Sequence, residues 1–353
     1  MSTETTPELL DALLRVAAPS GYEGPAAEVW REAASFGEVT SDALGSSVVR
    51  VVGDAGAPLL AVVGHIDEIG LVITHIDDEG FLWFEPIGGW DPQILVGHRA
   101  TVVTADGPIT GVLGKKPIHL LKEEDRKNVA KITDLHIDIG AKDGDEAKAM
   151  ARVGDPAVIA AEPVSLPNGR LVSRSLDNRL GSYVALEVAR RVGEGDGIAA
   201  TVAGLAVAQE EIGLYGSRTS AFSLDPDLAV AVDVTHATDA PGISKNENGD
   251  HALGSGPVIG RGSTLSERVT QGLIAAAESA GIEHTIEGSG RFTGTDADAI
   301  QMSRAGIAAG LVSIPLRYMH STVEMCQLSD VEAAIELIVA YAGTIEADDN
   351  FRS

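Results

Sequence analysis

Residues 198–217 read IAATVAGLAVAQEEIGLYGS. The first ten positions are mostly small or branched apolar residues, which favour a buried strand, and a glycine-punctuated turn follows. Two adjacent carboxylates, Glu210 and Glu211, stand where that strand ends. In open α/β sheets, ligands bind in the crevice at the strand ends. Because neighbouring like charges repel unless a positive group lies beside them, this stretch predicts a bound cation at the end of a core strand.

Strands and helices alternate around this segment. After residue 169, strand-like and helical patterns follow one another to the end of the chain, with strands at 227–236 and 308–317 and helices at 263–281 and 329–345. We expect Ser263 or Thr264 to cap the first of these helices and Ser329 to cap the second. Continuous apolar strands separated by helices indicate a largely parallel sheet that is covered on both faces.

Residues 69–167 have a different character. Short strand-like pieces such as FLWFEPIGG (81–89) and RATVVTADGPITGVLG (99–114) are separated by Gly, Pro and Asp turns, and only residues 143–153 have a clear helical pattern. The residues before this stretch resemble those after it in their strand and helix patterns. The sequence therefore predicts one discontinuous α/β domain, formed by residues 1–68 and 168–353, that is interrupted by a small β insert at 69–167.

Composition excludes several classes of partner. The 353 residues carry a net charge of −26 and no basic stripe, so nucleic acid is not an expected partner. Cys326 is the only cysteine, which rules out an intrachain disulfide and fits a reducing compartment. The first ten residues, MSTETTPELL, show no secretion signal, and no apolar run approaches the ~20 residues that span a bilayer. We expect a cytoplasmic protein without membrane contact.

Residues able to bind a metal ion follow five of the apolar segments. They are His65 with Asp67, Asp177, Glu210 with Glu211, Asp233, and His320. Because parallel strands end at one edge of a sheet, these residues could converge in one crevice. A lone histidine beside a core strand is commonly structural, and Asp177 alone could cap the helix after it. As a set, however, these nitrogen and oxygen ligands suit zinc, cobalt or manganese rather than calcium.

Two divalent ions that share one carboxylate, about 3.5–4 Å apart, form a known hydrolytic device. His65 and Asp67 lie on one face of a strand, because side chains alternate with period two, and this spacing suits a metal ligand and its orienting partner. Glu210 and Glu211 are expected to point opposite ways along an extended segment. One would then bind metal, while the other would stay free as a base.

With these residues assembled, the sequence resembles the tetrahedral (TET) aminopeptidase family of dinuclear metallo-aminopeptidases, some of whose members are labelled glutamyl aminopeptidase or endoglucanase. The matching segments are, in order, PSGYEGP, GHIDEIG, DIGA, SLDNRLG, QEEIGLYGS, AVDVTH, GTDA and YMHSTVE, between residues 19 and 324. The resemblance implies a phosphorylase/hydrolase-like catalytic domain with a mixed sheet between helices. It also implies an inserted, PDZ-like β-barrel domain that contributes to assembly.

The resemblance also implies a role for each site residue. One metal would be held by His65, Asp177 and Asp233, and the other by Asp177, Glu211 and His320, with Asp177 as the bridge. Glu210 would be the general base, and Asp67 would orient His65. A cis peptide bond is implied after Asp177.

The loop around GTDA borders the pocket for the first side chain of the substrate in the resembled family. Thr295, Asp296 and Ala297 are therefore expected wall residues. Arg291 lies just before this loop and could attract an acidic first residue of a peptide. The alternative is that Arg291 is an ordinary surface arginine on a glycine-rich loop.

We therefore expect an aminopeptidase that removes N-terminal residues from short peptides, uses two zinc or cobalt ions per chain and assembles into a homo-oligomer, in the family a tetrahedral dodecamer. An endoglucanase-type glycosidase is an alternative, but that chemistry needs no metal and leaves His65 and His320 unexplained. Another dinuclear amidohydrolase remains possible. So does an inactive metal-binding assembly protein, although an intact base at Glu210 argues against that.

Overall fold

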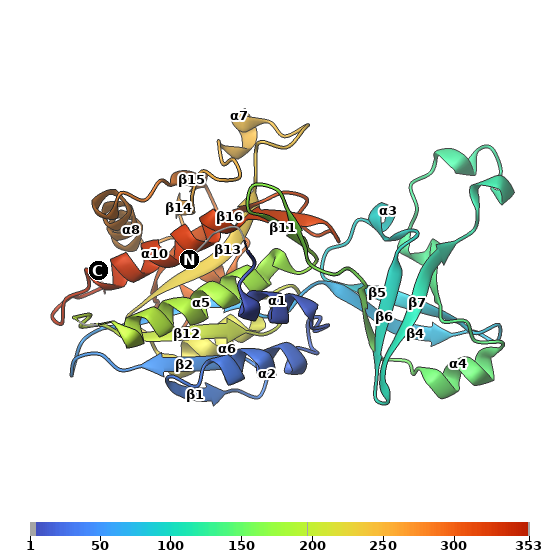
Figure 1. Ribbon diagram of the computed structural model, residues 1–353, viewed down its shortest axis with the longest axis horizontal. Helices are drawn as coiled ribbons and strands as arrows, with labels where there is room; N and C mark the ends of the chain where they lie inside the picture. Colours follow the sequence, from blue (N-terminus) through green and yellow to red (C-terminus); the bar gives the residue numbers. More distant parts are fainter. Residues whose placement is uncertain (1–4, 196, 352–353) are drawn as a thin grey trace.

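The structure, a computed structural model, describes residues 5–195 and 197–351, and within them an eight-stranded mixed sheet lies beside a closed six-stranded barrel (Figure 1). The four central strands of the sheet are parallel to one another. In spatial order the strands are β1 (Glu38–Ser41), β2 (Ser47–Val51), β12 (Thr201–Val207), β3 (Leu59–His65), β13 (Leu228–His236), β16 (Ala308–Leu316), β14 (Val258–Gly262) and β15 (Thr285–Ser289). The predicted α/β fold with an inserted β-barrel is confirmed.

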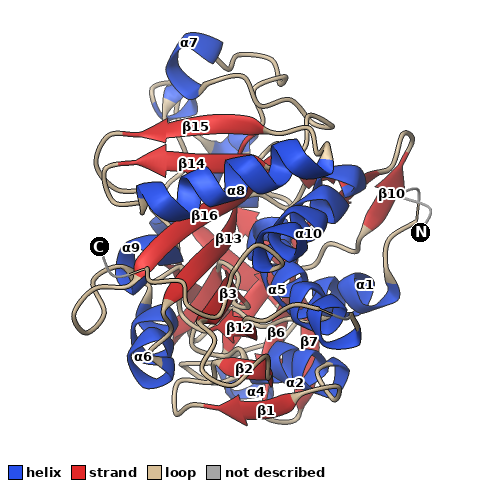
Figure 2. Cartoon of the chain, turned by 90° about the vertical axis from the view of Figure 1, so that its left-hand side faces the viewer, coloured by secondary structure: helices blue, strands red, loops and turns tan. Residues whose placement is uncertain are grey.

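Helices cover both faces of the sheet (Figure 2). One face packs against α1 (Glu8–Arg15), α2 (Gly24–Ala33), α5 (Leu176–Glu194), α8 (Glu267–Ala280) and α10 (Leu328–Ala342). The other face packs against α6 (Tyr215–Leu224) and α9 (Asp296–Ile300). The alternation of side chains along β3 shows why: Leu60 and Val62 enter the first core, and Ala61 and Val63 enter the second. None of the described helices has both the length and the apolar character that a membrane span needs.

Glycine allows α5 to lie directly against the centre of the sheet. A Cβ atom on Gly64 of β3 would come within 2.1 Å of the carbonyl carbon of Gly181 in α5. A Cβ atom on Gly204 of β12 would lie 2.5 Å from the carbonyl oxygen of Ala185. Only residues without a side chain permit such an approach. The start of α5 is thereby held close to the carboxyl end of β3.

The barrel strands run, in spatial order, as β4 (Gly70–Ile76), β5 (Phe81–Ile87), β8 (Leu135–Asp138), β7 (Gly107–Lys115), β6 (Arg99–Thr104) and β9 (Pro156–Ile159). Apolar side chains such as Leu71, Leu82 and Leu113 fill its interior. Short helices α3 (Pro92–Leu95) and α4 (Gly144–Met150) flank it, and α4 lies where the sequence predicted a helix. Three 3-10 turns, Ile118–Leu120, Asp125–Lys127 and Ile132–Asp134, follow β7.

A third, small sheet and one short helix complete the described structure. The sheet consists of β10 (Val164–Leu166), β11 (Arg170–Ser173) and β17 (Glu324–Gln327), and the helix α7 (Lys245–Asn248) follows β13. The chain therefore leaves the barrel after Ile159 and pairs again with the α/β part from Val164 onwards.

Two predicted helix caps are wrong. The N-cap position of α8 is Ser266, not Ser263 or Thr264, and the Ser263 hydroxyl instead donates to the carbonyl of Gly290, in the loop after β15. The closing helix α10 begins at Leu328, directly after β17, so Ser329 lies inside its first turn.

Candidate functional site

The residues that follow the central strands meet at one cavity of about 1000 Å³. β3 ends at His65, Asp233 lies on β13, and Asp177 lies in the first turn of α5. His320 follows β16 after a short irregular stretch, and the peptide bond between Asp177 and Asn178 is cis, as the resemblance implied. The cavity is lined by all six side chains proposed to face the reaction: His65, Asp177, Glu210, Glu211, Asp233 and His320.

The described residues form three groups of possible metal ligands: Asp177 belongs to two of them, and the third consists of His65, Glu210 and Glu211. Oδ1 of Asp177 lies 3.2 Å from Nε2 of His65, and its Oδ2 lies 3.3 Å from Nε2 of His320. His65 and Asp233 complete one group with Asp177, and Glu211 and His320 complete the other; in each group the ligand atoms lie within 4.8 Å of one another. One carboxylate therefore offers a separate oxygen to each group.

The two glutamates do not point opposite ways. The strand β12 ends at Val207, and Gln209 adopts a left-handed conformation with φ of 59°, so Glu210 and Glu211 are not in an extended segment. Both side chains line the cavity. Oε2 of Glu210 lies 3.6 Å from Nε2 of His65, and Oε1 of Glu211 lies 3.4 Å from Nε2 of His320. The two carboxylates approach different histidines in one cavity.

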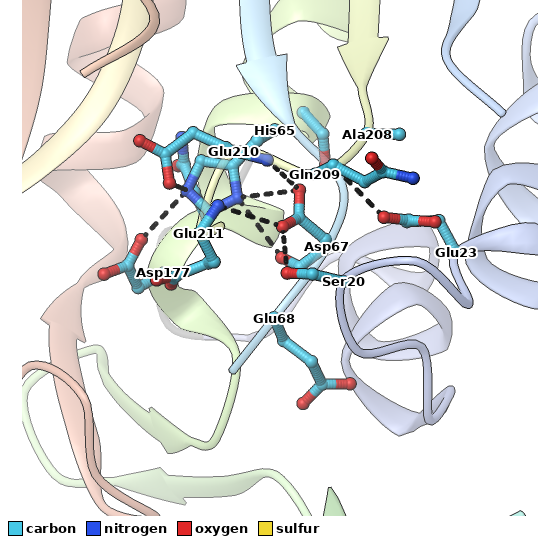
Figure 3. Close-up of polar contacts among 12 residues, drawn as sticks. Ser20, Glu23, His65, Asp67, Glu68, Asp177, Ala208, Gln209, Glu210 and Glu211 are labelled. Carbon is cyan, nitrogen blue, oxygen red and sulfur yellow. Dashed lines mark hydrogen bonds and ion pairs between the residues drawn. The ribbon is translucent and has the colours of Figure 1, made fainter. Parts of the chain in front are cut away.

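Asp67 is fully buried and holds several parts of the site together (Figure 3). Its carboxylate accepts hydrogen bonds from the Ser20 hydroxyl and from the backbone amides of Glu210 (3.1 Å) and Glu211 (3.2 Å). Its Oδ1 lies 3.5 Å from Nδ1 of His65, and the same ring nitrogen lies 3.2 Å from the carbonyl oxygen of Asp67. Asp67 thus contacts both His65 and the turn that carries the glutamates.

Sequence reasoning missed Glu324, a buried carboxylate beside the second group. Its Oε2 accepts from the amide of Asp177 (3.1 Å), and its Oε1 accepts from the amide of His320 (2.9 Å). Glu324 therefore fixes the backbone of two residues at the cavity. Its position at the end of YMHSTVE, four residues after His320, was the available signal.

A buried ion network beneath the site was also missed. Glu68, next to Asp67, pairs with Arg174 and with Arg179, whose Nη2 lies 3.2 Å from Oε1 of Glu68. Arg179 is completely buried, and this burial lowers its pKa to about 10. Its Nη1 donates to the carbonyl of Leu13 in α1. The network ties the end of β3 to α5 and α1, and breaking such a pair on one side costs about 3–5 kcal/mol.

The electrostatics of the site favour a cation. Burial, together with the nearby carboxylates of Asp233, Asp296 and Glu211, raises the pKa of Glu210 to about 10 against the opposing effect of His65. Burial also raises the pKa of Glu211 and of Asp233. Oε1 of Glu211 is buried and accepts no hydrogen bond from any residue that the structure describes. Several carboxylates that cannot all be ionised together fit a site whose charge is balanced by bound metal ions.

The ionisation of the histidines is also affected by the excess of negative charge in the site. The carboxylates of Asp177 and Glu211, whose oxygens lie 3.3 and 3.4 Å from Nε2 of His320, raise the pKa of His320 to about 11. Burial opposes ionisation of Asp177, but its contacts with His320 and His65 outweigh that effect and lower its pKa. The donor set of imidazole nitrogens and carboxylate oxygens is the one that zinc and similar ions prefer.

Of the four residues expected to contact substrate, two line the cavity and two are buried behind its wall. Arg291 and Thr295 line the cavity, and the Thr295 hydroxyl accepts from the amide of Ala297 at the start of α9. Asp296 and Ala297 are buried, and Ala297 packs in the apolar core between α9 and the sheet. Burial raises the pKa of Asp296 to about 6.

The cavity wall also contains Glu287, which sequence reasoning missed. Glu287 is half-buried on β15, and its Oε1 accepts from the hydroxyl of Thr235, 3.1 Å away. Thr235 lies two residues after Asp233 on β13, so the two side chains face the same way. Arg291, by contrast, is exposed on its loop.

Comparison with known proteins places the chain among peptidases. A family model described as M42 glutamyl aminopeptidase matches residues 45–337. The lysyl aminopeptidase of Pyrococcus furiosus is 34% identical over 94% of this chain and 95% of its own length. A TET aminopeptidase structure from a marine sediment archaeon (Thaumarchaeota archaeon) covers 96% of both chains with a TM-score of 0.91 and 34% identity. The TET1 peptidase of Pyrococcus horikoshii, which can assemble into a tetrahedron or a large octahedral shell, is 35% identical over 95% of this chain and 98% of its own, with a TM-score of 0.83.

Proposed function

Because this chain belongs to the M42 glutamyl aminopeptidase family, we propose that it removes N-terminal residues from short peptides with two metal ions and a glutamate base. As a member it is an aminopeptidase, a hydrolase that acts on peptide bonds. The observation that carries the finer proposal is the position of Asp177, which offers one oxygen to each of two histidine-containing groups.

In this proposal His65, Asp177 and Asp233 hold one ion, and Asp177, Glu211 and His320 hold the other, zinc or cobalt in each case. Bound ions would supply Lewis acidity for the scissile carbonyl and lower the pKa of a water toward about 7. The buried Oε1 of Glu211, which accepts no hydrogen bond from the described residues, and the raised pKa values of Glu211 and Asp233 support this assignment.

Glu210 acts as the general base. Its carboxylate faces the cavity. His65, Glu210 and Glu211 form a third possible group of ligands, but the proposed assignment uses only the two groups that share Asp177 and leaves Glu210 to take a proton from the attacking water. Glu210 then gives that proton to the nitrogen of the leaving peptide, as general acid–base catalysis requires. Asp67 holds the backbone amides of Glu210 and Glu211 and thereby positions both side chains.

The proposal is tested with one set of peptides and one chelator. Peptides with a free N-terminus should be cleaved at the first bond, the same peptides blocked by N-acetylation should not, and blocking the C-terminus should have little effect. Chelation should abolish cleavage, and added zinc or cobalt should restore it. Cleavage that requires a free C-terminus would indicate a different dinuclear amidohydrolase, and chelator-resistant hydrolysis of cellulose would indicate a glycosidase.

The first side chain of the substrate is proposed to lie against the wall that contains Thr295, with Asp296 and Ala297 buried behind it and Arg291 and Glu287 on the cavity surface. Because Arg291 is exposed, we expect Arg291→Ala to lower the ratio of glutamyl to leucyl cleavage by only about two- to fivefold. Glu287→Gln removes a half-buried negative charge while keeping an acceptor for Thr235, and should raise the same ratio. The kcat/KM values of glutamyl and leucyl substrates measure both effects. If the ratio of glutamyl to leucyl cleavage is unchanged in Arg291→Ala, Arg291 has no role in substrate preference and is an ordinary surface arginine.

Assembly is proposed to follow the tetrahedral pattern of TET peptidases, as a dodecamer, with residues 69–167 as the assembly domain and residues 1–68 and 168–353 as the catalytic domain. The likeness to the Pyrococcus horikoshii TET1 peptidase supports this. A closed cage would admit short or unfolded peptides only. We expect light scattering at working concentration to give the mass of twelve chains. A monomer mass would contradict the proposal.

A further inference from the structure

The barrel reaches the metal-ligand groups through one short loop. Gly88, Gly89 and Trp90 lie between β5 and α3, and the carbonyl oxygen of Gly89 lies 2.9 Å from Nδ1 of His320. His320 belongs to the α/β part, 231 residues further along the chain. The two histidines of the site therefore differ: His65 has its Nδ1 beside the carbonyl of Asp67, two residues away, whereas His320 relies on the inserted barrel.

The loop packs tightly against the Asp177, Glu211 and His320 group. A Cβ atom on Gly89 would lie 3.2 Å from Nδ1 and 3.4 Å from Cε1 of the His320 ring. A Cβ atom on Gly88 would lie 3.3 Å from Oε2 of Glu211. The loop is anchored in the barrel by Trp90, whose Nε1 donates to the carbonyl of Gly70 (2.9 Å). The backbone of the loop thus covers two members of this group.

This contact has a direct chemical effect on His320. A carbonyl oxygen only accepts, so Nδ1 must carry the hydrogen, and in the neutral ring Nε2 is then left with its lone pair. Nε2 is the atom that faces Asp177 and Glu211. A histidine that ligates metal is ordinarily oriented in this way by a partner on its other nitrogen.

We propose that the barrel loop 88–90 positions His320 for metal binding, so that the barrel is part of the active site as well as a means of assembly. The inference rests on the proposed function in one respect, that the two groups bind metal ions. It follows that the ion held by Asp177, Glu211 and His320 depends on the placement of the barrel. The ion held by His65, Asp177 and Asp233 does not share this dependence.

The test is the variant Gly89→Ala. Gly89 lies outside the left-handed region of φ, so alanine is tolerated by the backbone, but its methyl group crowds the His320 ring. Gly24→Ala is the matched control, because a Cβ atom there meets no other residue within 4 Å. Cobalt binding is measured on the full-length protein by competition with a chromophoric chelator and by the absorption spectrum of the bound ion. We expect Gly89→Ala to bind one of the two ions about 10–100-fold more weakly, as for other losses of a ligand's orienting partner, and the control to match the wild type.

A second variant, Trp90→Phe, keeps most of the ring volume but removes the indole donor that anchors the loop. It should weaken the same ion by a smaller factor. Thermal unfolding and light scattering on each variant show whether folding and assembly are intact. Wild-type affinity for both ions in Gly89→Ala, or an equal weakening of both ions, would overturn the inference. A wild-type protein that binds no cobalt would instead overturn the proposed function.

Discussion

Glu210→Gln is expected to lower kcat by at least about 10²-fold, and by as much as about 10⁴-fold, while both metal ions remain bound. Glutamine has nearly the same shape as glutamate but cannot take a proton from water at neutral pH. Glu210 lies at the cavity and is not a ligand in the proposed assignment, which uses the two groups that share Asp177, so its replacement should leave both of these ligand sets intact. Steady-state kinetics on a free-amine peptide, together with elemental analysis of the purified protein, measure both parts of the prediction.

Glu211→Ala is the matched control, because it changes the neighbouring carboxylate of the same turn. Oε1 of Glu211 lies 3.4 Å from Nε2 of His320, so its loss should weaken one ion, and added metal should partly restore activity. The reverse pattern, with metal loss in Glu210→Gln and retained metal in Glu211→Ala, would exchange the roles of the two residues. Full activity in Glu210→Gln would contradict the proposal that Glu210 is the general base.

Asp177→Ala is expected to remove activity altogether and to weaken both ions at once. Asp177 is the only residue shared by the two groups, with Oδ1 toward His65 and Oδ2 toward His320. Without it each group has two ligands left, and the two histidines lose the carboxylate between them. The measurement is metal content after gel filtration, with the rate of peptide cleavage in the presence and absence of added zinc.

Variants of His65 and His320, each of which belongs to one of the two groups that share Asp177, provide the comparison with Asp177→Ala. His65→Ala and His320→Ala should each weaken one ion and leave the other, since each belongs to only one of the groups that share Asp177. Because Glu324 accepts from the backbone amides of both Asp177 and His320, circular dichroism should accompany these assays to show that the fold persists. Retention of one tightly bound ion in Asp177→Ala would contradict the bridging role.

The sequence predicted most of the architecture and the convergence of the site residues. The order of apolar strands and the polar residues on them were enough to place His65 and Asp233 at one edge, because parallel strands end together. Asp177 reaches this edge on α5 instead, since the strand before it, β11, belongs to the small antiparallel sheet. A small β insert was predicted from short strands and turn residues, and its barrel form was implied by the family resemblance. These features are visible locally, in windows of ten to twenty residues.

The misses have a common physical origin. Glu324, Arg179 and Gly89 act through partners that lie 147, 111 and 231 residues away, and no local pattern encodes such pairings. The orientation of Glu210 and Glu211 was missed because a single left-handed residue, Gln209, redirects the chain after the strand. The cap of α8 was missed because Ser263, Thr264 and Ser266 are equivalent candidates by sequence. The start of α10 was missed because this helix follows β17 directly, with Gln327 at its N-cap position.

The close approach of Gly64 and Gly181 has a consequence for how this enzyme can evolve. Gly64 immediately precedes His65, and Gly181 lies one helical turn after Asp177, so their contact sets the spacing between a strand-borne and a helix-borne ligand. A descendant chain could exchange residues around the cavity and acquire new substrates without disturbing this spacing. An added methyl group at either glycine would push α5 away from β3 and separate the ligands, although every ligand would still be present. Substitutions around the cavity can therefore change substrate preference in descendants of this chain. The distance between the metal ligands, by contrast, requires that Gly64 and Gly181 both remain glycine.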